Sequence, residues 1–86
     1  SKREHSMTHF GEIANPETDA LLIVNETKED VPNYIGPNSF AEVAFGFYFG
    51  KKVFLKNDIY EPYRDELEGW GVIPLRGNLE ELFKQI

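Results

Sequence analysis

The feature that most constrains the fold is a continuous apolar run from Ala20 to Val24, bounded by Asp19 and Asn25. A strand with one face in water would alternate apolar and polar residues. An unbroken apolar run instead indicates a strand covered on both faces, which is typical of parallel sheets. The run is far shorter than the roughly 20 residues that a membrane-spanning helix needs.

Helix and strand signals alternate around this run. Apolar spacing predicts strands and helices in turn along the chain, and that alternation favours parallel strands with right-handed crossovers. We therefore predict a three-layer α/β fold, a partial flavodoxin-like or Rossmann-like domain, with a parallel sheet of about three strands and flanking helices. The expected strands are near residues 20–25, 52–56 and 72–75, and the expected helices are residues 2–14, 39–49, 63–69 and 78–85, the last capped by Asn78.

Size and composition narrow the function classes. Residues 1–86 suffice for a single α/β domain, and nine basic against fifteen acidic side chains give a net charge of −6. That balance argues against binding to nucleic-acid polymers or to an anionic membrane surface. The absence of cysteine excludes disulfides, thiolate zinc sites and cysteine nucleophiles, and it fits a cytoplasmic protein. We expect neither a cofactor nor a metal, because His5 and His9 are a lone pair at helical spacing and are read as surface residues.

The expected ligand site is beyond the carboxyl ends of the strands, where open parallel sheets bind their ligands. Asn25 and the long polar loop that follows it are at this edge, as is Asp58 after the second strand. The start of the helix at Ser39 faces the same edge, and its N–H groups would favour an anion. The favoured interpretation of Asp58 itself is an exposed loop carboxylate, and Tyr34 either stacks on a ligand base or covers the core.

Glu42 is the one charged residue of the predicted helix over residues 39–49. Ser39 followed by Glu42 three residues later matches a capping box, in which the two side chains satisfy backbone N–H groups at the helix start. Alternatively, Glu42 is a carboxylate aimed at the pocket mouth, where it could attack an anomeric carbon. Both interpretations stay open from the residues alone.

The segment Asn38-Ser39-Phe40-Ala41-Glu42, followed by a helix that ends in Gly50-Lys51 before a strand, resembles the nucleoside 2-deoxyribosyltransferase-like family. Residues 19–25 resemble the third strand of that family. Tyr34-Ile35-Gly36 and Gly77-Asn78-Leu79 resemble a loop and a C-terminal turn in one of its branches. The resemblance extends from about Thr8 to the end of the chain.

The resemblance implies a flavodoxin-like domain that breaks or exchanges the N-glycosidic bond of a nucleoside or nucleotide. By position Glu42 matches the nucleophile that attacks C1′ of 2-deoxyribose, and Ser39 matches a hydroxyl residue before it. The substrate-binding residues expected on this basis are Asn25, Tyr34, Gly36, Asn38, Ser39 and Asp58.

Two departures from the family keep a second function open. The family domain begins with a β-α-β half that carries a Gly-rich loop, and this sequence has no such half. Asn25 also stands where many active members have Asp, and an amide cannot act as an acid or a base. The alternative is a non-catalytic nucleotide-binding or protein-interaction domain that retains the fold. The first strand would then have a bare edge, which we expect a second copy or an N-terminal segment to cover in a homo-oligomer or a longer chain.

Overall fold

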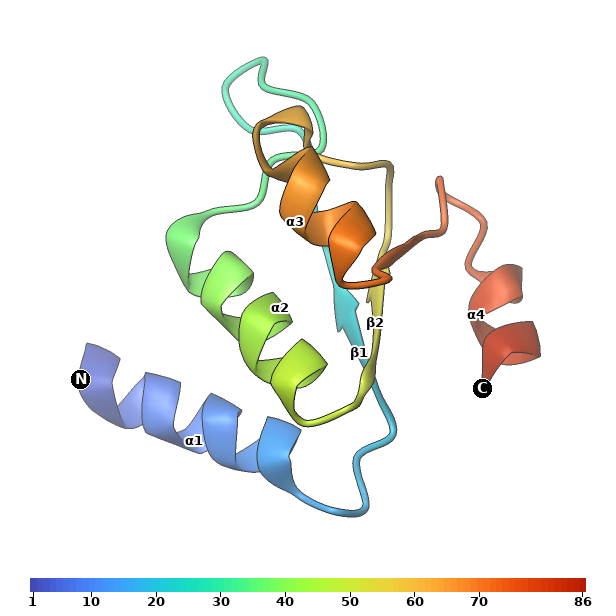
Figure 1. Ribbon diagram of the computed structural model, residues 1–86. Helices are drawn as coiled ribbons and strands as arrows, with labels where there is room; N and C mark the ends of the chain where they lie inside the picture. The colour runs from blue at the N-terminus through green and yellow to red at the C-terminus, as the bar shows by residue number, and fades with distance from the viewer.

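The computed structural model describes all residues, 1–86, and its helices and strands alternate along the chain (Figure 1). The elements are α1 (Lys2–Ala14), β1 (Ala20–Ile23), α2 (Pro37–Tyr48), β2 (Lys52–Leu55), a 3₁₀ helix (Glu61–Tyr63), α3 (Arg64–Gly69), β3 (Ile73–Pro74) and α4 (Glu80–Gln85).

The three strands form one parallel sheet in the order β1-β2-β3. Leu22 of β1 is opposite Phe54 of β2, and Phe54 is in turn opposite Ile73 of β3. Helices α2 and α3 lie to one side of the strands, and the short α4 lies to the other (Figure 1). This arrangement confirms the predicted α/β class with a three-stranded parallel sheet and flanking helices.

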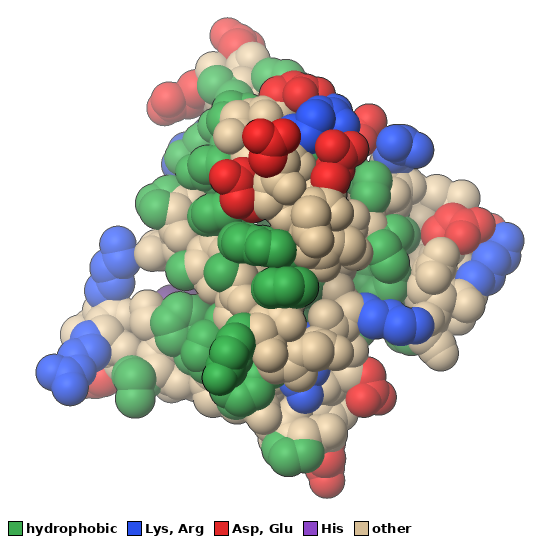
Figure 2. Space-filling view, viewed as in Figure 1, with side chains coloured by type: hydrophobic (Ala, Val, Ile, Leu, Met, Phe, Trp, Pro, Cys, Tyr) green, Lys and Arg blue, Asp and Glu red, His purple; other side chains and the backbone are tan.

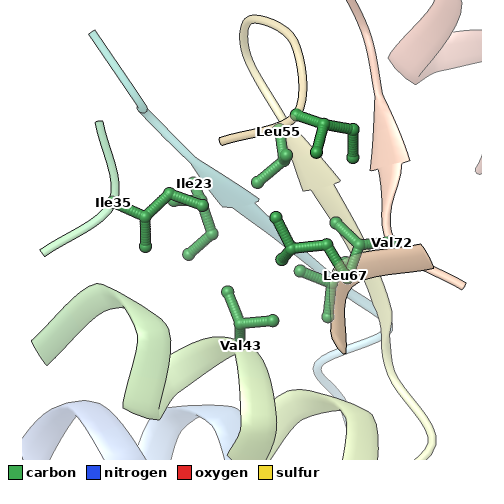
Figure 3. Close-up of a cluster of buried hydrophobic side chains, with 8 residues drawn as sticks. Ile23, Ile35, Val43, Leu55, Leu67 and Val72 are labelled. Carbon is green, nitrogen blue, oxygen red and sulfur yellow. The ribbon is translucent and has the colours of Figure 1, made fainter. Parts of the chain in front are cut away.

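The core is between the sheet and the helices α2 and α3. Val43 of α2 and Leu67 of α3 point toward the strands, where they meet Ile23 and Leu55 (Figure 3). Each of these side chains is at least 94% buried, and full burial of one such side chain contributes about 1.5–3 kcal/mol. Of the apolar run at β1, only Ile23 is buried in this core, whereas Leu22 and Val24 are exposed. The prediction that the strand is covered on both faces is therefore wrong, because α2 covers only one face of β1.

Gly46 allows α2 to approach the sheet closely. A Cβ atom at this position would lie 2.9 Å from Leu21 Cδ1 and 3.2 Å from Val53 Cγ2. Both distances are shorter than ordinary carbon contacts of about 3.5–4.0 Å. The absence of a side chain at Gly46 thus sets the distance between α2 and the first two strands.

Aromatic residues of α2 continue the packing beyond the core. Phe40 stacks on Tyr63 at 4.1 Å between ring centroids, and Trp70 stacks on both Phe40 and Phe47 at 5.6 and 5.4 Å. Hydrophobic side chains also gather on the surface shown in Figure 2. Among the large ones that stay exposed are Tyr48 at 80% and Met7 at 67%. Tyr48 and Phe47 thus leave the C-terminal end of α2 partly uncovered.

Two helix starts differ from their predicted positions. Helix α2 begins at Pro37 with Gly36 as its N-cap, and no side chain caps it, so the predicted start and capping box at Ser39 are wrong. The reason is Pro37, whose fixed φ and missing N–H suit the first helical position. Helix α4 begins at Glu80 rather than at Asn78, although the Asn78 Oδ1 accepts a hydrogen bond from the Glu80 N–H at 3.2 Å. None of the helices combines the length and the apolarity needed to cross a bilayer.

Strand β1 is an edge strand. The carbonyl groups of Asp19 and Ile23 accept hydrogen bonds from the N–H groups of Lys52 and Lys56 in β2. Because backbone groups alternate in direction along a strand, those of Ala20 and Leu22 point to the open edge. Leu22 is 39% exposed, and Val24 just beyond the strand is 61% exposed. Unpaired backbone groups beside exposed apolar side chains are a template for strand addition.

We predict that the chain self-associates through this edge. Replacing Val24 by Lys places a charge at the edge, which natural sheets use to prevent pairing, and should leave a monomer with unchanged circular dichroism. Met7→Lys is the matched control, because Met7 is similarly exposed but is on α1. Sedimentation velocity measures the result, and a wild-type chain that stays monomeric at every concentration would contradict the prediction.

Candidate functional site

A pocket of about 500 Å³ lies where β1 ends and α2 begins. Four of the six predicted substrate-binding residues line it, and we call it the loop pocket. They are Tyr34, Gly36, Asn38 and Ser39. The wall formed by the loop after β1 includes Glu26, Thr27 and Lys28.

Asn25 fixes the loop that forms this pocket. Its side chain is 1% exposed, and its Nδ2 donates hydrogen bonds to the carbonyl groups of Asp58 at 2.7 Å and Asn33 at 3.3 Å. Its Oδ1 accepts the N–H of Asn57 at 2.9 Å, and its backbone carbonyl accepts the Asn57 Nδ2 at 3.0 Å. The Asn25 amide is therefore engaged with the backbone beneath the pocket and does not line it.

Asn33 forms further hydrogen bonds between the loop after β1 and the segment after β2. Its φ of 57° is in the left-handed region, which Asn tolerates better than most residues. The Asn33 side chain donates to the carbonyl of Ile59 at 3.4 Å and accepts the N–H of Asp58 at 3.3 Å. Ile35, two residues after Asn33, is 1% exposed and belongs to the core. The loop is thus anchored on both sides of Tyr34.

A tight turn carries Lys28 to the mouth of the loop pocket. Lys28 and Val31 exchange two backbone hydrogen bonds of 3.0 and 2.9 Å, and the two residues between them have φ values of 48° and 66°. The Lys28 Nζ is 5.4 Å from the centroid of the Tyr34 ring, which is within the range of a cation–π interaction. Tyr34 also packs edge-on against Tyr60 at 5.5 Å.

The start of α2 gives the loop pocket a positive electrostatic end. Gly36 leaves the first turn without a side-chain cap, so the N–H groups of Asn38 and Ser39 are available to a ligand. On the loop wall, Glu26 pairs with Lys56, and the hydrogen bond from Lys56 lowers the pKa of Glu26 below its usual value. The Glu26 charge is thereby largely compensated.

Glu42 lies outside the loop pocket, on the side of α2 that faces α1. Its Oε1 is 3.2 Å from the Nδ1 of His9, with 25% of the Glu42 side chain and 41% of the His9 side chain exposed. The two side chains border a hollow of about 250 Å³ beside Ala20 and Leu21, at the beginning of β1. We call this the α1–α2 hollow. Glu42 therefore faces the start of β1, whereas the sequence analysis expects it to face the carboxyl ends of the strands.

The helix start connects the two regions. A second depression of about 210 Å³ between α1 and the beginning of α2 is bordered by Asn38, Ser39 and Glu42. Asn38 and Ser39 line the loop pocket as well. Ser39 and Glu42 are three residues apart, which is about 4.5 Å along the helix axis.

Asp58 is also outside the loop pocket. Its Oδ1 accepts the N–H of Ile59 at 2.7 Å, and its Oδ2 is 3.3 Å from the Nε of Arg76. The hydrogen bond from Ile59, aided by the charge of Arg76, lowers the pKa of Asp58. Arg64 likewise pairs with Glu61 and Glu68. Both arginines thus form ion pairs with carboxylates of neighbouring residues.

Sequence reasoning missed two residues of this region. His9 is 33 residues from Glu42, and no local pattern reveals that α1 and α2 bring them together. Lys28 is in a charged stretch, and only its turn directs it to Tyr34. The His5 and His9 rings lie 4.1 Å apart in a tilted arrangement, and no group of three or more possible metal ligands is found anywhere in the chain.

No protein-family model, curated protein sequence or solved structure matches the chain. Function is therefore argued from the residues of the loop pocket and of the α1–α2 hollow.

The Asn25 network generates a prediction about stability and pH. In Asn25→Asp the ionised carboxylate would face the carbonyl oxygens of Asp58 and Asn33, to which it cannot donate. Burial and these oxygens raise the carboxyl pKa in the folded state above its unfolded value of about 3.9. Ionisation then opposes folding, so the variant should be least stable at neutral pH and regain stability as the pH falls toward 4.

Asn25→Ala is the matched comparison, since it removes the two hydrogen bonds that Nδ2 donates, together with the one that Oδ1 accepts, without adding a titrating group. It should lower the unfolding free energy by about 3 kcal/mol, because each buried group left unpaired costs about 1–3 kcal/mol. Urea denaturation of both variants between pH 4 and pH 7 gives the measurement. Equal pH dependence in the two variants would refute the assigned role of the amide.

Proposed function

We propose that the protein binds a nucleoside or nucleotide at the loop pocket and breaks its N-glycosidic bond, with Glu42 as the nucleophile. The observation that carries this proposal is that Tyr34, Gly36, Asn38 and Ser39, expected from the family resemblance, line one pocket at the uncapped start of α2. Pockets beyond the strand ends of parallel sheets are where ligands of this kind bind.

Two features of the loop pocket suit the parts of a nucleotide. The Tyr34 ring offers an aromatic face for a base, and a stack of this kind contributes about 1–3 kcal/mol per base. The N–H groups at the start of α2 and the Lys28 ammonium suit a phosphate or a sugar oxygen. These features support recognition of a small molecule, and nothing in the pocket requires a polymer.

The chemistry requires the sugar to extend from the loop pocket along the first two turns of α2. One Glu42 oxygen attacks C1′, the bond from C1′ to the base nitrogen breaks, and its electron pair leaves with the base, which takes a proton from water. A second water then attacks C1′, releases the Glu42 carboxylate and loses a proton to solvent, or another base accepts the sugar. Glu42 is only a quarter exposed, and a partly dehydrated carboxylate stabilises an oxocarbenium-like transition state more strongly than one in bulk water.

One observation favours the alternative, a nucleotide-binding domain without catalysis. Glu42 does not line the loop pocket, and it is held by His9 on another side of α2. In that case ligands would bind at Tyr34 and no base would be released. Binding and chemistry must therefore be measured separately.

We also propose a cytoplasmic location. A chain without cysteine forms no disulfide and needs no oxidising compartment. Fractionation of the source cells, followed by immunoblotting, tests this location.

The first experiment incubates the protein with a panel of 2′-deoxynucleosides and their monophosphates and follows free base by chromatography. Glu42→Gln should lower base release on the order of 10³-fold with binding unchanged, because an amide is a poor nucleophile. Glu12→Gln is the matched control, since Glu12 borders the same α1–α2 hollow but is given no chemical role. A fully active Glu42→Gln variant would eliminate Glu42 as the nucleophile.

The second experiment concerns recognition by Tyr34. Tyr34→Leu removes the aromatic face and should weaken binding about tenfold, which corresponds to a stack of roughly 1–3 kcal/mol. Tyr34→Phe keeps the face and should bind like the wild type. Isothermal titration calorimetry measures both, and equal affinities for the Leu and Phe variants would show that the base does not stack there.

A further inference from the structure

His9 is the one side chain that forms a hydrogen bond with Glu42, and it comes from a different helix. The His9 Nδ1 is 3.2 Å from Glu42 Oε1, across the contact between α1 and α2. We propose that His9 is the positioning residue for Glu42: it binds one carboxylate oxygen and leaves the other free to act as the nucleophile. This inference rests on the proposed function of Glu42.

The hydrogen bond dictates the protonation of His9. An ionised carboxylate only accepts hydrogen bonds, so the proton of a neutral imidazole must be on Nδ1. Free neutral histidine in water mainly carries this proton on Nε2. In proteins, the hydrogen bonds that the two ring nitrogens form determine which of them carries the proton. The pair therefore predicts an Nδ1–H tautomer for His9, which can be measured in the absence of any substrate.

The other charged groups near His9 and Glu42 do not change the predicted Nδ1–H tautomer of His9. On α1, the His5 ring lies tilted against the His9 ring at 4.1 Å, Glu12 borders the same hollow, and Lys2 borders the neighbouring depression that Glu42 also lines. From the β1 side the lining residues are uncharged, and from α2 the one charged group is Glu42 itself. No cation competes with His9 for the Glu42 carboxylate, since no other ion pair of Glu42 is formed.

Helix α1 has other anchors, so His9 can be changed without undocking it. Ile13 is 5% exposed, and Phe10 stacks on Phe45 of α2 at 4.8 Å. The Lys51 Nζ also donates to the carbonyl of Asn15 just after α1, at 3.0 Å. Substitution of His9 therefore tests the position of the carboxylate rather than the packing of the helix.

The first test is nitrogen NMR of the free protein with labelled histidine. In the neutral form of the ring, the proton should be found on Nδ1, and the Glu42→Gln variant should raise the share of the Nε2–H form. A His9 that carries its proton on Nε2 in the wild type overturns the inference, whatever the activity of the protein.

The second test uses two amides of different reach. In His9→Asn the amide nitrogen takes the place of Nδ1 and can still donate to Glu42, whereas in His9→Gln the amide takes the place of Nε2 and cannot. We expect His9→Gln to lower kcat about 10–100-fold with KM nearly unchanged, the cost of a misplaced group, and His9→Asn to retain most of kcat. A purely structural role for His9 would instead lower the stability of both variants and leave both kcat values near that of the wild type.

The outcomes separate the two claims. Rescue by Asn but not by Gln, together with the Nδ1–H tautomer, supports the positioning role. Equal kcat values for the two variants overturn it while leaving Glu42 as the nucleophile. A wild-type protein that shows the Nδ1–H tautomer but releases no base overturns the proposed function, and the positioning role with it.

Discussion

The buried amide of Asn25 is the interaction on which the rest of the structure depends. At the end of β1 the chain leaves the sheet, and the backbone groups of the loops after β1 and β2 need partners that a strand would otherwise supply. Asn25 satisfies three of them through its side chain, at Asn33, Asn57 and Asp58. Only an amide offers a donor and an acceptor side by side in this geometry, so Asp would not be equivalent.

The hydrogen bonds of Asn25 help to determine where the loop pocket and the α1–α2 hollow lie. Because the loop is held at Asn25 and Asn33, Tyr34 is fixed beside the start of α2, and Ile35 enters the core. Gly46 then sets how closely α2 approaches the sheet, and α1 packs on its far side. The loop pocket and the α1–α2 hollow thus lie on two sides of one helix: residues at the start of α2 line the loop pocket, and Glu42 borders the hollow.

The sequence predicts the sheet well because hydrophobic burial leaves a local signal. The apolar run at residues 20–24 and the shorter apolar stretch within residues 52–56 each predict a parallel strand, and the structure contains both strands. Four residues that line the loop pocket are also among those expected from the family resemblance, and loops after parallel strands lie at the edge where such sheets bind ligands. The start of α2 differs from the predicted start at Ser39 because a proline at the first helical position outweighs the Ser39 pattern. The contact of His9 with Glu42 and the burial of Asn25 depend on tertiary packing, so no local pattern reveals them.

The central claim is that Glu42 forms a covalent bond to the sugar, and mass spectrometry tests it most directly. A reaction with a 2′-deoxynucleoside that releases base is quenched in acid, the protein is digested, and the peptides are mapped. The account predicts a deoxyribosyl ester on the peptide that contains Glu42, absent from the Glu42→Gln variant. Base release with an unmodified Glu42, or with the sugar attached to another side chain, would contradict it.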